Sequence, residues 1–87
     1  MSYWNYRVIR KYHMGTDTEI FQIHEVYYND KHQIEGWTES PIAPKGESLS
    51  ELKGDMELMR KAFEKPVLFE QTENNEETLV EAPASGR

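Results

Sequence analysis

The sequence contains no cysteine among its 87 residues. Disulfide bonds, thiolate zinc sites and cysteine-based catalysis are therefore excluded, and this absence suits a reducing compartment. No segment approaches the roughly 20 consecutive apolar residues that a membrane-spanning helix needs. The first twelve residues, MSYWNYRVIRKY, lack the apolar stretch of a signal peptide. We therefore expect a cytoplasmic protein that has no membrane partner.

Positive charge is also scarce. Ten lysines and arginines stand against sixteen acids, so the net charge is −6. Residues 70–87 hold five acids and one base, whereas residues 1–69 hold eleven acids and nine bases. This distribution argues against a general binder of nucleic-acid phosphates and favours a basic protein as partner.

The chain length fits one small domain. We assign residues 1–69 to a single α+β domain and residues 70–87 to an acidic, disordered tail, because the tail has few large apolar residues and much charge. A domain of this size buries only about 60% of its unfolded surface, so association with another chain would add useful apolar burial.

Three segments in the first half have the composition of strands. Residues 3–12, 19–28 and 33–39 are rich in aromatic and β-branched residues, and residues 3–12 alternate with period two. The turns between them are HMGTDT, where Gly15 can take positive φ, and NDKH.

The second half predicts one helix. Ser48 followed by Glu51 forms a capping box, and Pro66 ends the segment. Its apolar residues follow a 3-4-3-4 spacing and define one stripe: Leu49, Leu52, Met56, Met59 and Phe63. Residues 66–70, PVLFE, read as a fourth strand. The expected fold is therefore β-β-β-α-β, an antiparallel sheet with one helix packed on one face.

Hairpin geometry predicts which residues share a face. A first turn centred on Gly15 and Thr16 places Tyr6 opposite Glu25, and a second turn at NDKH places His24 opposite Trp37. One face, expected beneath the helix, then collects these apolar residues: Trp4, Tyr6, Val8, Phe21, Ile23, Tyr27 and Ile34. Because neighbouring residues of a strand point to opposite faces, His24 and Glu25 cannot act on the same atom.

The face without the helix carries more large apolar groups than a solvated face should. Its residues are rich in types found at binding hot spots, and we predict that they form an interface with another chain. The alternatives are an exposed patch without a partner and a ligand surface. The interface candidates are His24, Trp37, Val26, Tyr28, Ile20 and Arg7.

Glu25 is the unexplained acid on the other face. A structural role predicts that Tyr6, Tyr27 or a backbone N–H satisfies its carboxylate. A functional role predicts a pocket in which Glu25 is reachable, walled by Trp4, Tyr6 and Tyr27. A wrong register is the third explanation.

Metal and cofactor chemistry find no support in the sequence. The histidines are His13, His24 and His32, and they form no HxH, HxxxH or HExxH spacing. The glycines form no phosphate-binding loop, and we expect no metal, no cofactor and no catalytic residue.

Two resemblances can be stated. The runs WNYRVIRK, IHEVYY and GWTESPIAPKGESLSELKGDMELMRKAFEKPVL resemble a group of small bacterial proteins without assigned function, over roughly residues 3–68. The strand order and the residues Pro41, Pro44, Gly46, Glu47 and Ser48 resemble HicB-type antitoxins. That resemblance implies neutralisation of a small RNA-cleaving toxin. Many members add a C-terminal DNA-binding domain, and the acidic tail here argues against operator binding.

The sequence therefore predicts a non-enzymatic protein-interaction module, with a HicB-like antitoxin as one concrete form. Its partner would be a second copy, forming a homodimer, or another protein. The alternative is a small enzyme or ligand-binding protein that uses Glu25 or His24. A third option is single-stranded nucleic-acid binding through the aromatic face that lacks the helix.

Overall fold

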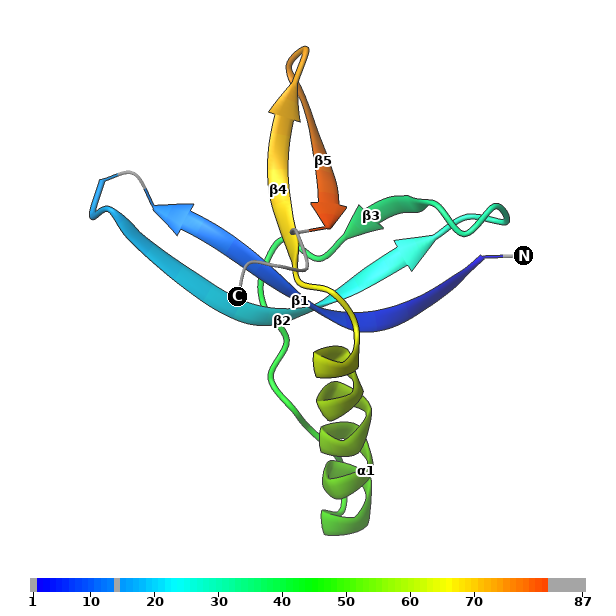
Figure 1. Cartoon of the computed structure of the whole chain (residues 1–87). Helices are drawn as coiled ribbons and strands as arrows, with labels where there is room; N and C mark the ends of the chain where they lie inside the picture. Colours follow the sequence, from blue (N-terminus) through cyan, green and yellow to red (C-terminus); the bar gives the residue numbers. More distant parts are fainter. Residues whose placement is uncertain (1, 14, 82–87) are drawn as a thin grey trace.

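The fold is α+β, with five strands in one mixed sheet and one α-helix (Figure 1). The computed structural model describes residues 2–13 and 15–81. The elements are β1 (Tyr3–His13), β2 (Thr18–Tyr28), β3 (Ile34–Trp37), α1 (Leu49–Arg60), the 3-10 helix η1 (Lys61–Glu64), β4 (Leu68–Glu73) and β5 (Glu76–Glu81). The strand order across the sheet is β3-β2-β1-β4-β5. The α+β class is confirmed, but the sheet has an additional strand and is not purely antiparallel.

The long hairpin of β1 and β2 has the predicted register. Tyr6 lies opposite Glu25, and the pairing runs from Tyr3 opposite Tyr28 to His13 opposite Thr18. The alternation of apolar residues selects this register, because a one-residue slip would exchange the two faces. In the turn, Asp17 takes positive φ, and no glycine in the described residues does.

The predicted register of β2 with β3 is wrong by two residues. Trp37 lies opposite Val26 instead of His24, and Gly36 lies opposite Tyr27 instead of Glu25. An irregularity between Tyr27 and Tyr28 then brings Ile34 opposite Tyr28. A bulge of this kind moves a residue to the other face of the sheet. Ile34 consequently packs on the face away from the helix, and not on the helix face as predicted.

β4 and β5 pair as an antiparallel hairpin over residues 68–81. The expectation of a disordered tail is therefore corrected for residues 70–81. Asn74 and Asn75 join β4 to β5, and both take positive φ, as a two-residue hairpin turn requires. Leu79 is buried. Residues 82–87 lie outside the described part of the chain.

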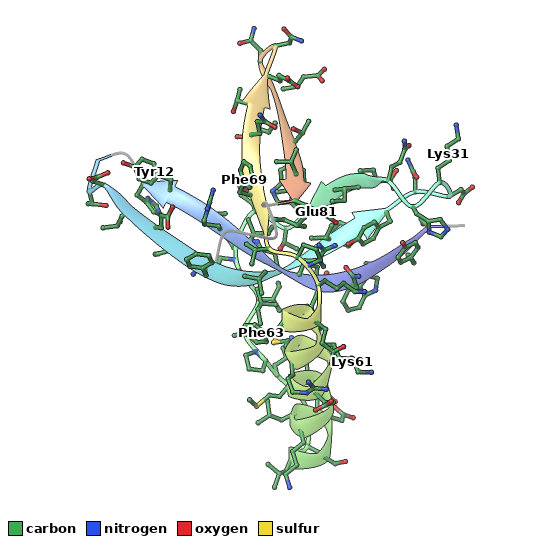
Figure 2. The ribbon with its side chains drawn as sticks, viewed as in Figure 1. Tyr12, Lys31, Lys61, Phe63, Phe69 and Glu81 are labelled. Atoms are coloured by element: carbon green, nitrogen blue, oxygen red, sulfur yellow. The ribbon has the colours of Figure 1, made fainter. Side chains whose placement is uncertain are left out.

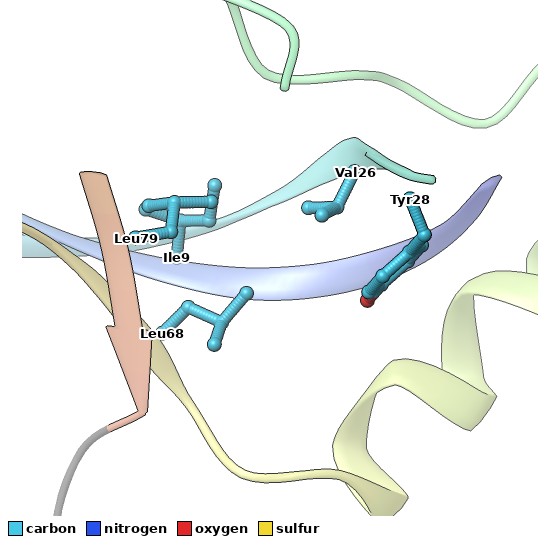
Figure 3. Close-up of a cluster of buried hydrophobic side chains, with 5 residues drawn as sticks. All are labelled: Ile9, Val26, Tyr28, Leu68 and Leu79. Atoms are coloured by element: carbon cyan, nitrogen blue, oxygen red, sulfur yellow. The ribbon is translucent and has the colours of Figure 1, made fainter. Parts of the chain in front are cut away.

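Two small cores lie on opposite faces of the β1–β2 hairpin. The core on the side of the β4–β5 hairpin contains Ile9, Val26, Tyr28, Leu68 and Leu79 (Figure 3). Ile34 and Trp37 pack against it. The helix-side core contains Tyr6, Val8, Met59 and Ala62, with Ile23, Ile42 and Val67 packed against it. Both faces of the central strand are therefore covered, each by a different C-terminal element.

The sequence predicted a helix packed along one face of the sheet, and the structure differs from this prediction. Figure 1 shows α1 projecting away from the sheet, and its buried contact with β1 lies at its C-terminal end. Met59 is the one buried residue of α1, and Ala62 of η1 is buried beside it. Leu49 is 68% exposed, and Phe63 is 71% exposed. Most of the apolar stripe therefore lies in solvent.

The helix N-terminus has the predicted cap. The Ser48 hydroxyl accepts a hydrogen bond from the Glu51 backbone N–H at 3.1 Å, and the Glu51 carboxylate accepts one from the Glu47 backbone N–H at 2.9 Å. Gly46 lies against this first turn. A Cβ atom at Gly46 would lie 2.4 Å from the backbone nitrogen of Leu52. Gly46 is therefore required by close packing, whereas a Cβ at Gly54 would meet nothing within 4 Å.

These two glycines give opposite predictions. We expect Gly46→Ala to destabilise the protein by about 1–3 kcal/mol, because the backbone of the helix must shift. We expect Gly54→Ala to stabilise it by up to about 1 kcal/mol, because alanine favours the helix and meets no clash. Urea unfolding of both variants measures the difference. Equal effects of the two substitutions would contradict the packing described here.

Candidate functional site

The face that was expected to bind another chain is covered by this chain. The β4–β5 hairpin and β3 pack on it, so His24, Val26, Tyr28 and Arg7 are buried and Trp37 is half-buried. Ile20, further along β2, is exposed. Most of the residues predicted to form an interface on this face are therefore buried within the chain, because the prediction did not include β5.

His24 is a fully buried polar residue in this face. Its Nδ1 lies 2.9 Å from the Thr38 carbonyl oxygen. Because a carbonyl only accepts, Nδ1 carries the proton and Nε2 holds the lone pair. Nε2 is buried and has no hydrogen-bond partner in the described residues. Burial lowers the pKa of His24 below its usual 6.5, against the opposing effect of the Thr38 bond.

Arg7 is the second buried polar residue. It lies opposite His24 on β1 and donates hydrogen bonds to the Tyr28 hydroxyl at 2.9 Å and to the Pro66 carbonyl at 2.8 Å. Arg7 therefore fastens the segment that leads from η1 into β4. This is a structural role, and it accounts for an arginine in a strand that is otherwise apolar at this point.

The candidate interaction surface is instead the exposed part of the helix stripe. Leu49, Met56 and Phe63 are each separated by seven residues, and each is more than half exposed. Figure 2 shows Phe63 and Lys61 on opposite sides of the helical segment. The sequence identified this stripe correctly but assigned it to the core. We refer to Leu49, Met56 and Phe63 as the exposed stripe.

The candidate pocket around Glu25 is present in part. A groove of about 690 Å³ lies between the helix and the β1–β2 hairpin, and Trp4, Tyr6, Glu25, Asp55 and Leu58 line it. Tyr27 does not line it, but its hydroxyl donates a 2.7 Å hydrogen bond to Glu25. This bond gives the Glu25 carboxylate one of the partners that a structural role predicts.

Asp55 is the groove residue that the sequence did not single out. It accepts a hydrogen bond from the Tyr6 hydroxyl at 2.7 Å and another from the Lys45 backbone N–H at 2.9 Å. The Lys45 bond and then the Tyr6 bond lower the pKa of Asp55. Burial, followed by the bond to Asp55, raises the pKa of Tyr6 to about 12. Asp55 is therefore an ionised carboxylate that links the helix to β1.

Metal binding and membrane insertion can be assessed for the described residues. Within residues 2–13 and 15–81, no three His, Asp or Glu side chains come together in a group that could hold a metal ion. Over the same residues, no helix has the length and apolarity needed to cross a membrane.

No family model, curated protein or solved structure matches this chain. The two resemblances therefore stay predictions.

His24 predicts a pH dependence of stability. Its pKa is lower in the folded chain than the usual 6.5, so the unfolded chain binds the proton more readily. The contribution of neutral, buried His24 to the unfolding free energy is therefore fully present above pH 6.5 and is lost as the pH falls below this value. Lys11 opposes protonation and Glu70 favours it, while the Arg7 side chain lies on the neighbouring strand.

Chemical unfolding between pH 7.5 and pH 5 measures this effect. We expect His24→Gln to reduce the fall in unfolding free energy over this range, by up to about 1.4 kcal/mol per pH unit. His13→Gln is the matched control, because His13 is exposed at the end of β1. A pH dependence that is identical in both variants would contradict a buried, neutral His24.

Proposed function

We propose that this protein is a non-enzymatic interaction module that self-associates through the exposed stripe of its helix. The observation that carries the proposal is that Leu49, Met56 and Phe63 form one apolar row and find no cover within the described chain. Aligned apolar residues on a small domain mark an association surface. A second copy of the chain is the partner to which we commit.

The spacing of the stripe supports helix-to-helix packing. Residues 49, 52, 56, 59 and 63 follow the a/d pattern of a coiled-coil seam. Met59 of this row is buried against β1, which leaves Leu49 and Met56 of α1 and Phe63 of η1 for a partner. Met56 lies at the centre, with Leu49 and Phe63 seven residues to either side. In an antiparallel pair with twofold symmetry, Leu49 of one copy would meet Phe63 of the other, and the two Met56 side chains would meet at the axis.

The charge distribution supports the antiparallel arrangement. Residues 47–58 contain four acids and one base, whereas residues 59–65 contain three bases and one acid. An antiparallel pair places the acidic half of one helix beside the basic half of the other, whereas a parallel pair would place like charges together. This complementarity is the reason for choosing a second copy over an unrelated partner.

Self-association would also stabilise the helix. A helix of 12 residues is marginal in isolation, and here only its C-terminal end is buried. The cap at Ser48 and the ion pairs of Arg60 with Glu57 and Glu64 add small contributions at the surface. Burial of the stripe between two copies would supply the packing that the sheet does not provide.

Met56→Gln tests this proposal. Each copy would lose about 1.5–3 kcal/mol of side-chain burial, so we expect the dimer dissociation constant to rise at least about tenfold. Sedimentation equilibrium over a range of concentrations measures it. The stability of the isolated subunit should change little, because Met56 is 54% exposed there.

Leu58→Gln is the matched control. Leu58 lies on the same helix and is 52% exposed, but it lines the groove and does not belong to the stripe. We expect this variant to dimerise as the parent does. A parent protein that stays monomeric at millimolar concentration, or equal effects of the two substitutions, would contradict the proposal.

A further inference from the structure

We infer that the groove between α1 and the β1–β2 hairpin binds an extended peptide segment by capturing an arginine or lysine side chain against Trp4, Glu25 and Asp55. This site is separate from the exposed stripe and does not depend on self-association.

The first observation is an open space that the chain itself does not fill. The groove measures about 690 Å³, and Gly54 lies in its helical wall. A glycine at this position costs about 1 kcal/mol relative to alanine. No close backbone contact requires it, because a Cβ there would meet nothing within 4 Å. The glycine therefore keeps space open beside the carboxylates.

The second observation is that acids and aromatic rings line the groove together. Three acids line it, namely Glu25, Glu51 and Asp55, and one base, Lys45, lines it with them. The Trp4 ring packs edge-on against Tyr6 with a centroid distance of 5.2 Å, and about half of Trp4 stays exposed. An exposed indole beside carboxylates is an arrangement that attracts an organic cation, most strongly a planar guanidinium.

The carboxylates are held in place before any ligand arrives. The Tyr6 hydroxyl and the Lys45 backbone N–H fix both oxygens of Asp55. The Tyr27 hydroxyl fixes Oε1 of Glu25, and no hydrogen bond from the described residues reaches Oε2. A cation would therefore meet oriented acceptors, which reduces the entropy cost of binding.

The third observation selects a peptide over a small amine. A second depression of about 420 Å³ shares Trp4, Tyr6 and Leu58 with the groove and continues to Lys61 and Lys65. The combined surface is acidic at one end, apolar in the middle and basic at the other. A segment with a cationic residue, an apolar residue and an acidic residue in succession complements this order.

The test uses the full chain labelled with ¹⁵N and the capped peptide acetyl-Ala-Arg-Leu-Glu-Ala-amide. The indole N–H signals of Trp4 and Trp37 are the reporters, and Trp37→Phe assigns them. Trp37 lies on the other face, where its indole donates to Glu70 at 3.2 Å. We expect a saturable shift of the Trp4 signal and an unchanged Trp37 signal.

Three changes should weaken the shift, and one should not. Replacing the peptide arginine by glutamine, or Glu25→Gln in the protein, should each weaken binding about tenfold, because one charge of the pair is lost. Gly54→Leu should abolish binding by filling the groove, while leucine favours the helix. Glu57→Gln should have no effect, because Glu57 pairs with Arg60 away from the groove.

Several results would overturn the inference. No Trp4 shift at millimolar peptide would do so, as would a shift that persists in Gly54→Leu. Arginine amide binding as tightly as the peptide would replace the peptide with a small cation as ligand. Oligomeric state is a separate readout, so loss of peptide binding in a protein that still dimerises leaves the proposed function standing.

Discussion

The short parallel pairing of β4 with β1 is the constraint on which the rest of the fold depends. It involves only Ile9 with Leu68 and Arg10 with Phe69, yet Ile9 and Leu68 are both fully buried. A parallel neighbour requires a crossover, and the connection from β3 through α1 and η1 is that crossover. Arg7 secures its end by donating to the Pro66 carbonyl. The chain therefore covers one face of the long hairpin with the base of the helix and the other face with β4 and β5.

This arrangement leaves the helix attached mainly by its C-terminal end. Met59 and Ala62 pack on β1. Nearer the N-terminus of the helix, Asp55 accepts a hydrogen bond from the Tyr6 hydroxyl of β1. The remainder of the apolar stripe faces solvent on one side, and the groove opens on another. The two surfaces that we propose for interaction have one structural cause, because the buried contacts of the helix with the sheet lie at its C-terminal end.

Much of the fold could be predicted from local patterns. The alternation in β1 and β2 and the cap at Ser48 gave correct elements and a correct first register. The errors came from longer-range effects. The pairing of β3 with β2 differs from the predicted register by two residues at Gly36 and Trp37, and it contains an irregularity between Tyr27 and Tyr28. The charged composition of residues 70–81 concealed β5, although Asn74 and Asn75 are a hairpin signal. Helical spacing identified the stripe, but it could not indicate whether the sheet covers it. Because β5 was not predicted, the predicted interface included residues such as Val26 and Tyr28 that pack with Leu79 of β5.

The central claim is that two copies bury the exposed stripe between antiparallel helices. Isotope-filtered nuclear Overhauser spectra of a mixed sample, in which half of the chains are labelled, test it most directly. The account predicts intermolecular contacts between the Met56 methyl groups of the two copies, and between Leu49 of one copy and Phe63 of the other. Spectra in which these three residues show contacts only within their own chain, at concentrations where the protein is dimeric, would contradict it.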